Sequence, residues 1–131
     1  MKQERVDPGW AWTRKFNISA GVKLGDHVHL SGLVALDGAG NLVGEGDVHA
    51  QSRQVFRNIE EALASVGAQM ADVTKITTWL TDMANYGDFA KARSEAFPNG
   101  VASTAICSPM LAMPGLLVEI EAIAVIGSGG A

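Results

Sequence analysis

Cysteine is nearly absent from this chain, with Cys107 as the only one in 131 residues. A single thiol excludes an internal disulfide and is typical of a reducing compartment. The N-terminal stretch MKQERVDPGW has no apolar core of the kind that a signal peptide needs, and no apolar run reaches the length of a membrane span. We therefore expect a cytoplasmic protein without a membrane partner.

Charge is also scarce, since Asp, Glu, Lys and Arg make up 18% of the residues and the formal net charge is −4. The basic residues are scattered and form no stripe that would follow a phosphate backbone, so no nucleic-acid partner is predicted. The Gly-rich stretch DGAGNLVG lacks the lysine and the helix of a phosphate-binding loop. The low charge indicates instead that part of the surface is hidden against other subunits.

The hydrophobic pattern predicts one α+β domain over residues 1–131, with residues 1–12 as an N-terminal segment and 127–131 as a flexible tail. The expected order is β-β-α-β-α-β-β. Asp47 is the expected N-cap of the first helix and Gly67 its stop, while the second helix begins after Asn85 and ends at Pro98. The strands are read from VKLGDHVHLSGLVAL with a turn at Gly25-Asp26, and from VTKITTWL, VASTAIC and LLVEIEAIAVI.

Two helices cannot cover both faces of a mixed sheet of four to six strands. They are expected on one face, which leaves the other face for a partner subunit. The last strand, LVEIEAIAV, fits this expectation because it is apolar on both sides.

Two glutamates interrupt that apolar strand. Alternation places Glu119 and Glu121 on the same face, where burial of unpartnered carboxylates is costly. Each is either an interface carboxylate held by a salt bridge or a backbone hydrogen bond, or a carboxylate of raised pKa that holds or activates water in an apolar pocket. The pattern alone leaves both interpretations open.

Other candidate residues carry weaker patterns. His27 and His29 share a strand face, a spacing that suits zinc, but a metal site needs a third ligand and His49 lies at the start of a helix. No metal site is therefore predicted. Cys107 has no neighbouring base and reads as a small buried thiol, and Trp10 and Trp12 are interpreted as packing residues before the first strand.

Four stretches in order, VKLGDHVHLSGLVALD, QSRQVFRNIEEALASVGA, VTKITTWLTDMANY and LVEIEAIAV, resemble the Rid family, also called YjgF/YER057c/UK114 or reactive intermediate deaminases. The resemblance covers residues from about 18 to 126. It implies a chorismate-mutase-like fold with two helices on one face, assembled as a homotrimer with a pocket between each pair of subunits. The best-known members hydrolyse 2-imino and enamino acids to 2-keto acids and ammonia, and they need no cofactor.

The resemblance assigns roles to matching positions. The glutamate that holds the attacking water falls on Glu119, whereas Glu121 falls on a more structural position. The Ser-Gly pair that presents backbone to the ligand is Ser31-Gly32.

Three family side chains are replaced in this sequence. Ile18 stands where the family has its pocket tyrosine, Ala102 where it has the arginine that grips the substrate carboxylate, and Thr104 at the position of a frequent cysteine. Loss of a bidentate arginine–carboxylate contact weakens imino-acid binding roughly tenfold to several hundredfold. Arg93 is either a substitute cation or a solvated residue of the second helix.

The predicted function is accordingly a Rid-type hydrolase of a small imine, enamine or related electrophile that is not a simple 2-imino acid. Glu119 is the expected catalytic residue, and Ile18, Ser31, Gly32, Ala102 and Thr104 are the expected binding residues. The alternative is a non-catalytic trimer that binds or senses a small ligand. Ribonuclease activity is disfavoured by the acidic charge.

Overall fold

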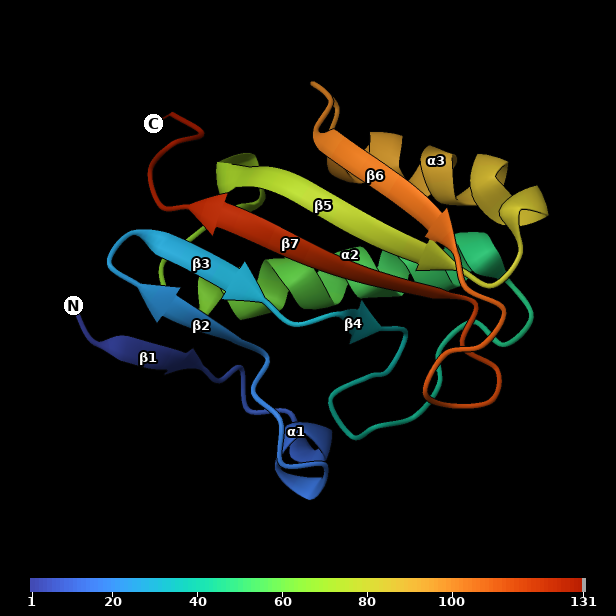
Figure 1. Cartoon of the computed structure of the whole chain (residues 1–131), viewed down its shortest axis with the longest axis horizontal. Helices are drawn as coiled ribbons and strands as arrows, with labels where there is room; N and C mark the ends of the chain where they lie inside the picture. The colour runs from blue at the N-terminus through green and yellow to red at the C-terminus, as the bar shows by residue number, and fades with distance from the viewer. Residues whose placement is uncertain (131) are drawn as a thin grey trace.

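The computed structural model describes residues 1–130 and shows one mixed sheet with helices along it (Figure 1). The strands lie in the order β1-β2-β3-β7-β5-β6, with the short β4 paired to β7. All pairings are antiparallel except that of β5 with β6. The elements in chain order are β1 Gln3–Val6, α1 Ala11–Lys15, β2 Gly21–Leu24, β3 His27–Leu30, β4 Leu33–Val34, α2 Val48–Ala64, the 3₁₀ turn η1 Met70–Asp72, β5 Val73–Leu80, the 3₁₀ turn η2 Met83–Asn85, α3 Tyr86–Ala96, β6 Ala102–Cys107 and β7 Val118–Val125.

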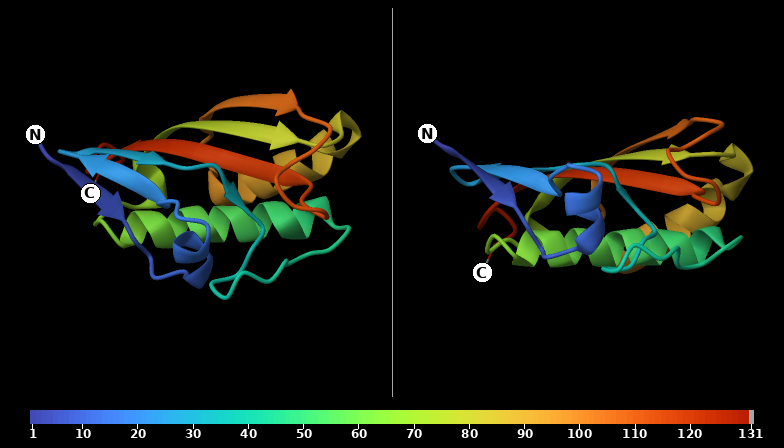
Figure 2. Two further views of the ribbon diagram at one scale, coloured as in Figure 1. Left: turned by 60° about the horizontal axis from the view of Figure 1, so that its bottom comes forward. Right: turned by 90° about the horizontal axis from the view of Figure 1, so that it is seen from below.

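The helices α2 and α3 lie side by side on one face of the sheet, as the side views show (Figure 2). This confirms the predicted α+β architecture. Within residues 1–130 no helix covers the opposite face, which we call the open face. None of the described helices is both long enough and apolar enough to cross a bilayer.

The termini of α2 follow from its sequence. The Asp47 side chain accepts a hydrogen bond from the backbone N–H of Ala50 at 2.9 Å, which confirms it as the N-cap. At the other end Gly67 adopts φ +82°, and the N–H of Ala68 donates to the carbonyl of Leu63 at 2.9 Å. A left-handed residue of this kind ends a helix, and glycine adopts it without strain.

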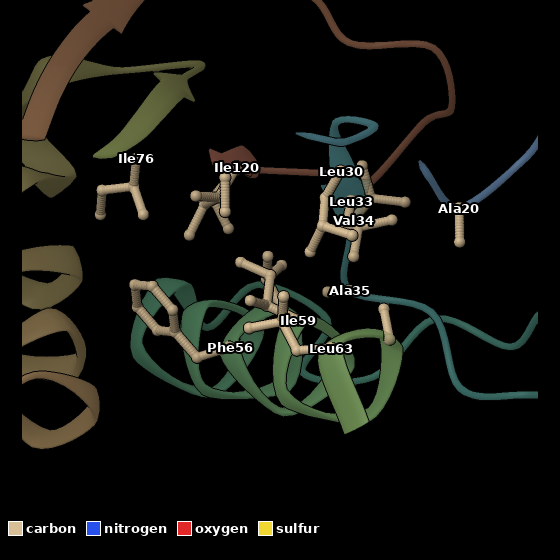
Figure 3. Packing of buried hydrophobic residues seen from close by; sticks show 14 of the residues in the cluster. Ala20, Leu30, Leu33, Val34, Ala35, Phe56, Ile59, Leu63, Ile76 and Ile120 are labelled. Carbon is tan, nitrogen blue, oxygen red and sulfur yellow. The ribbon is translucent and has the colours of Figure 1, made fainter. Parts of the chain in front are cut away.

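The core lies between α2 and the covered face of the sheet (Figure 3). Ile59 and Leu63 of α2 are fully buried together with Ile76 of β5 and Ile120 of β7. Each such side chain contributes about 1.5–3 kcal/mol relative to exposure. Along β7 the residues Val118, Ile120, Ala122 and Ala124 face this core. The alternate residues, among them Glu119 and Glu121, face the open side.

The N-terminal segment is part of the sheet. The sequence analysis named residues 1–12 only as an N-terminal segment and predicted no strand there, whereas β1 pairs with β2 with Arg5 opposite Val22. Trp10 and Trp12 stack at 5.3 Å between ring centroids and are 3% and 6% exposed, which confirms the packing role. With β1 the sheet has seven strands, and the two tryptophans that follow it pack in the core.

The segment after β7, predicted as a flexible tail over residues 127–131, forms hydrogen bonds at Ser128 and Gly129, and residue 131 lies outside the described residues. The N–H of Gly129 donates to Asp72 Oδ1 at 3.0 Å, and Ser128 Oγ donates to the Asp72 carbonyl at 3.3 Å. The other carboxylate oxygen, Oδ2, accepts the N–H of Gln69 at 3.0 Å. These backbone donors, Gly129 foremost, lower the pKa of Asp72, which is 2% exposed.

We expect Asp72→Asn to lower the free energy of unfolding by roughly 1.5–3 kcal/mol, because an amide nitrogen faces donors where the carboxylate accepted them. The contribution of Asp72 is fully present above the pKa of the unfolded chain and is lost as the pH falls through the lower folded-state pKa. Urea unfolding between pH 2 and 7 measures this, with the exposed Glu45→Gln as control. Equal loss of stability in both variants would contradict the assignment.

Candidate functional site

Glu119 lies on the open face near the start of β7. It is half-buried and stands opposite Trp79 of β5 and Val34 of β4. Burial raises its pKa, and the like charge of Glu121 raises it further. A carboxyl group of raised pKa binds a proton more readily than an ordinary glutamate, as general-base chemistry requires.

Gly32 lies directly against this carboxylate. A Cβ at position 32 would collide with Oε2, Cδ and Cγ of Glu119. Glycine therefore permits the close approach of the chain between β3 and β4 to the glutamate side chain. The two residues that the family resemblance pairs, Gly32 and Glu119, are brought together.

Ser31 precedes Gly32 in the chain and lines one hollow with Ile18. Ser31 donates its N–H to the Ala20 carbonyl at 2.9 Å and its hydroxyl to the Ser19 carbonyl at 2.7 Å. Ile18 is 48% exposed, and Ile18 and Ser31 both line a shallow hollow together with Val22 and His29. Both hydrogen-bond donors of Ser31 are used within the chain. Ser31 can therefore offer a ligand only its oxygen atoms, as hydrogen-bond acceptors.

Ala102 and Thr104 are exposed on the open face but belong to the edge strand β6, two strands away from β7. Across the strands Thr104 is the partner of Thr77, which in turn is the partner of Glu121. Glu119 is instead aligned with Trp79 and, beyond it, with Ile106. A single chain thus does not bring these two predicted residues to Glu119. They form a second group, at the opposite edge of the same face.

Lys75 is a residue that the sequence analysis missed. Its Nζ donates to Thr104 Oγ1 at 2.6 Å. On the neighbouring strands Lys75 stands opposite Ala102 of β6 and Ile123 of β7. Alternation along VTKITTWL places Lys75 on one face with Thr77 and Trp79, but only the register shows which strands flank it.

Arg93 lies on the other side of the edge strand. Its Nη1 donates to Tyr86 Oη and to Ser103 Oγ, both at 3.1 Å, and the guanidinium stands 5.3 Å from the Phe89 ring centroid. Ser103 alternates with Ala102 and Thr104 and thus points away from the open face. Within one chain Arg93 supports α3 and β6 and is not directed at Ala102.

The loop before β7 adds apolar surface close to Glu119. Residues 109–117 surround an open hollow whose lining includes Leu111, Met113 and Leu117. Leu117 directly precedes β7 and lies two residues before Glu119 in the chain.

The histidines and the cysteine are not assembled into a metal centre. Among the described residues no three His, Cys, Asp or Glu side chains lie close enough to hold an ion. His49 pairs with Glu95 at 2.7 Å, far along the chain from His27 and His29. Cys107 is exposed at the end of β6, so its predicted burial was wrong.

An open-faced sheet with two helices on one side, and a half-buried glutamate against a glycine, defines a small α+β domain with a candidate acid–base site. The Endoribonuclease L-PSP family model matches residues 13–126, and the chain belongs to this family, the YjgF/UK114/Rid group.

Solved structures agree with this assignment. The YjgF/YER057c/UK114 member Rv2704 from Mycobacterium tuberculosis is 28% identical, with a TM-score of 0.82 over 95% of this chain and 100% of that one. An L-PSP protein from Entamoeba histolytica is 30% identical, with a TM-score of 0.83 over 95% of this chain and 100% of that one. The Rid protein YyfA from Yersinia pestis, at 22% identity and a TM-score of 0.84 over 95% and 100%, supports the fold alone.

Proposed function

We propose that the protein is a Rid-type hydrolase of a small electrophile, an imine, enamine or related compound, and that it acts in a pocket between subunits. The observation that carries the proposal is Glu119, a half-buried carboxylate of raised pKa held against Gly32 on the open face. Membership of the family supports a Rid-type or small-molecule-binding role.

In the proposed reaction Glu119 accepts a hydrogen bond from a water molecule and takes its proton as the oxygen adds to the carbon of a C=N bond. That proton passes to the nitrogen and gives a carbinolamine. Glu119 then takes the proton of the new hydroxyl group and passes it to the nitrogen, the C–N bond breaks, and a carbonyl compound and ammonia leave. The raised pKa supports both halves of this step, because Glu119 must accept a proton and then return it.

The pocket is proposed to form when subunits assemble. In one chain Ile18, Ser31, Gly32 and Glu119 lie at one part of the open face, and Ala102 and Thr104 lie on the edge strand β6. A symmetric trimer in which the open face of one subunit meets the edge of the next would bring the two groups together. The exposed Ile106 and Ile123, at 44% and 36%, would be covered by such contacts.

Two other functions are weaker candidates. One is RNA cleavage, the activity in the family's name. It is disfavoured because the net charge of −4 and two carboxylates on the open face would repel a phosphate backbone. A non-catalytic binding trimer would use Glu119 only as a hydrogen-bond acceptor. It differs from the hydrolase in one testable respect, since it would bind an imine analogue without releasing ammonia.

We expect hydrolysis of freshly formed 2-iminobutyrate to be weak, at least about tenfold below that of an arginine-bearing family member, because Ala102 offers no cation to the carboxylate. A threonine dehydratase supplies the imine, and semicarbazide trapping measures how fast it disappears. An arginine-bearing family member serves as the positive control. Equal rates in the two proteins would show that another cation grips the carboxylate.

A further inference from the structure

A second cavity lies behind Ile18, between the end of β1 and α1. It measures about 200 Å³, large enough for one small polar group. Its lining consists of Arg5, Val6, Asp7, Thr13, Arg14 and residues 17–20. The function proposed above does not use this cavity.

Two arginines belong to this lining, Arg5 from β1 and Arg14 from α1, and both are exposed. Within residues 1–130 neither forms an ion pair or a side-chain hydrogen bond. The one carboxylate of the lining, Asp7, already accepts the N–H of Gly9 through Oδ1 at 2.9 Å. Two unpaired cations that line one cavity favour an anion between them, and guanidinium groups bind carboxylates in bidentate geometry.

The backbone fixes Arg14 relative to Ile18. The N–H of Asn17 donates to the Arg14 carbonyl at 3.1 Å, and the N–H of Ile18 donates to the Thr13 carbonyl at 3.0 Å. Asn17 has φ +53°, in the left-handed region that asparagine tolerates better than most side chains. This turn closes α1 and directs the chain from the arginine cavity to the open face.

The arginine cavity adjoins the candidate site. Ile18 and Ser19 line both this cavity and the open-face hollow that contains Ser31. Ser31 is followed by Gly32, which touches Glu119. In space the two arginines are therefore followed by the apolar Ile18, then by Ser31-Gly32, and last by Glu119.

We propose that Arg5 and Arg14 bind the carboxylate of the ligand whose electrophilic carbon reacts at Glu119, an inference that rests on the proposed function. Because Ile18 lies between the two sites, the substrate class is an acid whose carboxylate is separated from the reacting carbon by an apolar spacer. A 2-imino acid, whose carboxylate adjoins the reacting carbon, does not span this arrangement. The charge of the substrate is thus recognised away from Ala102.

The probes that test this are levulinate, a keto acid with a two-carbon spacer, and its uncharged methyl ester. Binding to the full chain at 0.15 M salt is followed by NMR on the amides of residues 17–20. We expect levulinate to shift these amides and Arg14→Gln to weaken its binding about tenfold, as loss of a charged hydrogen-bonded pair does. The methyl ester should bind wild type and Arg14→Gln equally.

Arg53→Gln is the matched control, since it removes the same charge from an exposed position of α2. It should leave levulinate binding unchanged, and the double variant Arg5→Gln/Arg14→Gln should abolish the preference for the acid over the ester. Equal levulinate affinity in wild type and both arginine variants would overturn the inference. If Glu119→Gln retains full turnover while levulinate still requires Arg14, the proposed function fails and the anion site stands.

Discussion

Glu119→Gln is expected to abolish turnover of the substrate, with a loss of about 10²- to 10⁴-fold in kcat, the usual contribution of a positioned acid–base group. The amide keeps the shape of the side chain and one hydrogen-bond acceptor, but it cannot take a proton from water. Ammonia release from a panel of enzymatically generated imines and enamines, coupled to glutamate dehydrogenase, measures the effect. A variant with undiminished kcat would remove Glu119 from the chemistry.

The same substitution should not harm the fold. The folded-state pKa of Glu119 is raised, so its contribution to stability is fully present below the unfolded pKa and is lost as the pH rises through the folded value. At neutral pH the ionised carboxylate therefore opposes folding, and Glu119→Gln should unfold at an equal or higher temperature. Glu121→Gln is the paired control, and it should weaken the assembly more than the chemistry.

The second large effect concerns assembly. We expect sedimentation equilibrium at micromolar concentration to give about three times the 13.7 kDa chain mass. Ile123→Asp should dissociate this species, because it places a charge on the open face where burial of an isoleucine contributes about 1.5–3 kcal/mol per subunit. Met83→Asp, at an apolar residue of η2 that is 42% exposed, is the control and should stay assembled. A wild-type monomer would contradict the inter-subunit pocket.

Some of the fold could be predicted from the sequence because local and tertiary preferences agree. The helix α2 has an N-cap at Asp47, a stop at Gly67 and an apolar face between them, and the structure has all three. The strand β1 lacks such a pattern. Only Val6 of its four residues is buried, so alternation is too short to detect, and its pairing to β2 depends on a long-range contact.

The C-terminal segment shows a different limit. Glycine and serine at 127–130 read as a free tail, yet Asp72 gives their backbone a buried acceptor that no local pattern announces. The pattern of β7 drew attention to Glu119 and Glu121 together, because a carboxylate without a partner is costly in an apolar strand, and only the family resemblance assigned the water-holding role to Glu119. The arginine cavity and the contact of Lys75 with Thr104 required the register of neighbouring strands and the turn after α1, which sequence spacing does not supply.

Titration of the Glu119 side-chain carboxyl by carbon-detected NMR tests directly whether this carboxyl has a raised pKa, and it needs no substrate. The Glu119 signal is assigned by its loss in Glu119→Gln. We expect a pKa above the ordinary glutamate value. It should fall when Glu121→Gln removes the neighbouring charge but stay above the ordinary value, because burial remains. A Glu119 carboxyl that titrates at or below the ordinary value would contradict this expectation.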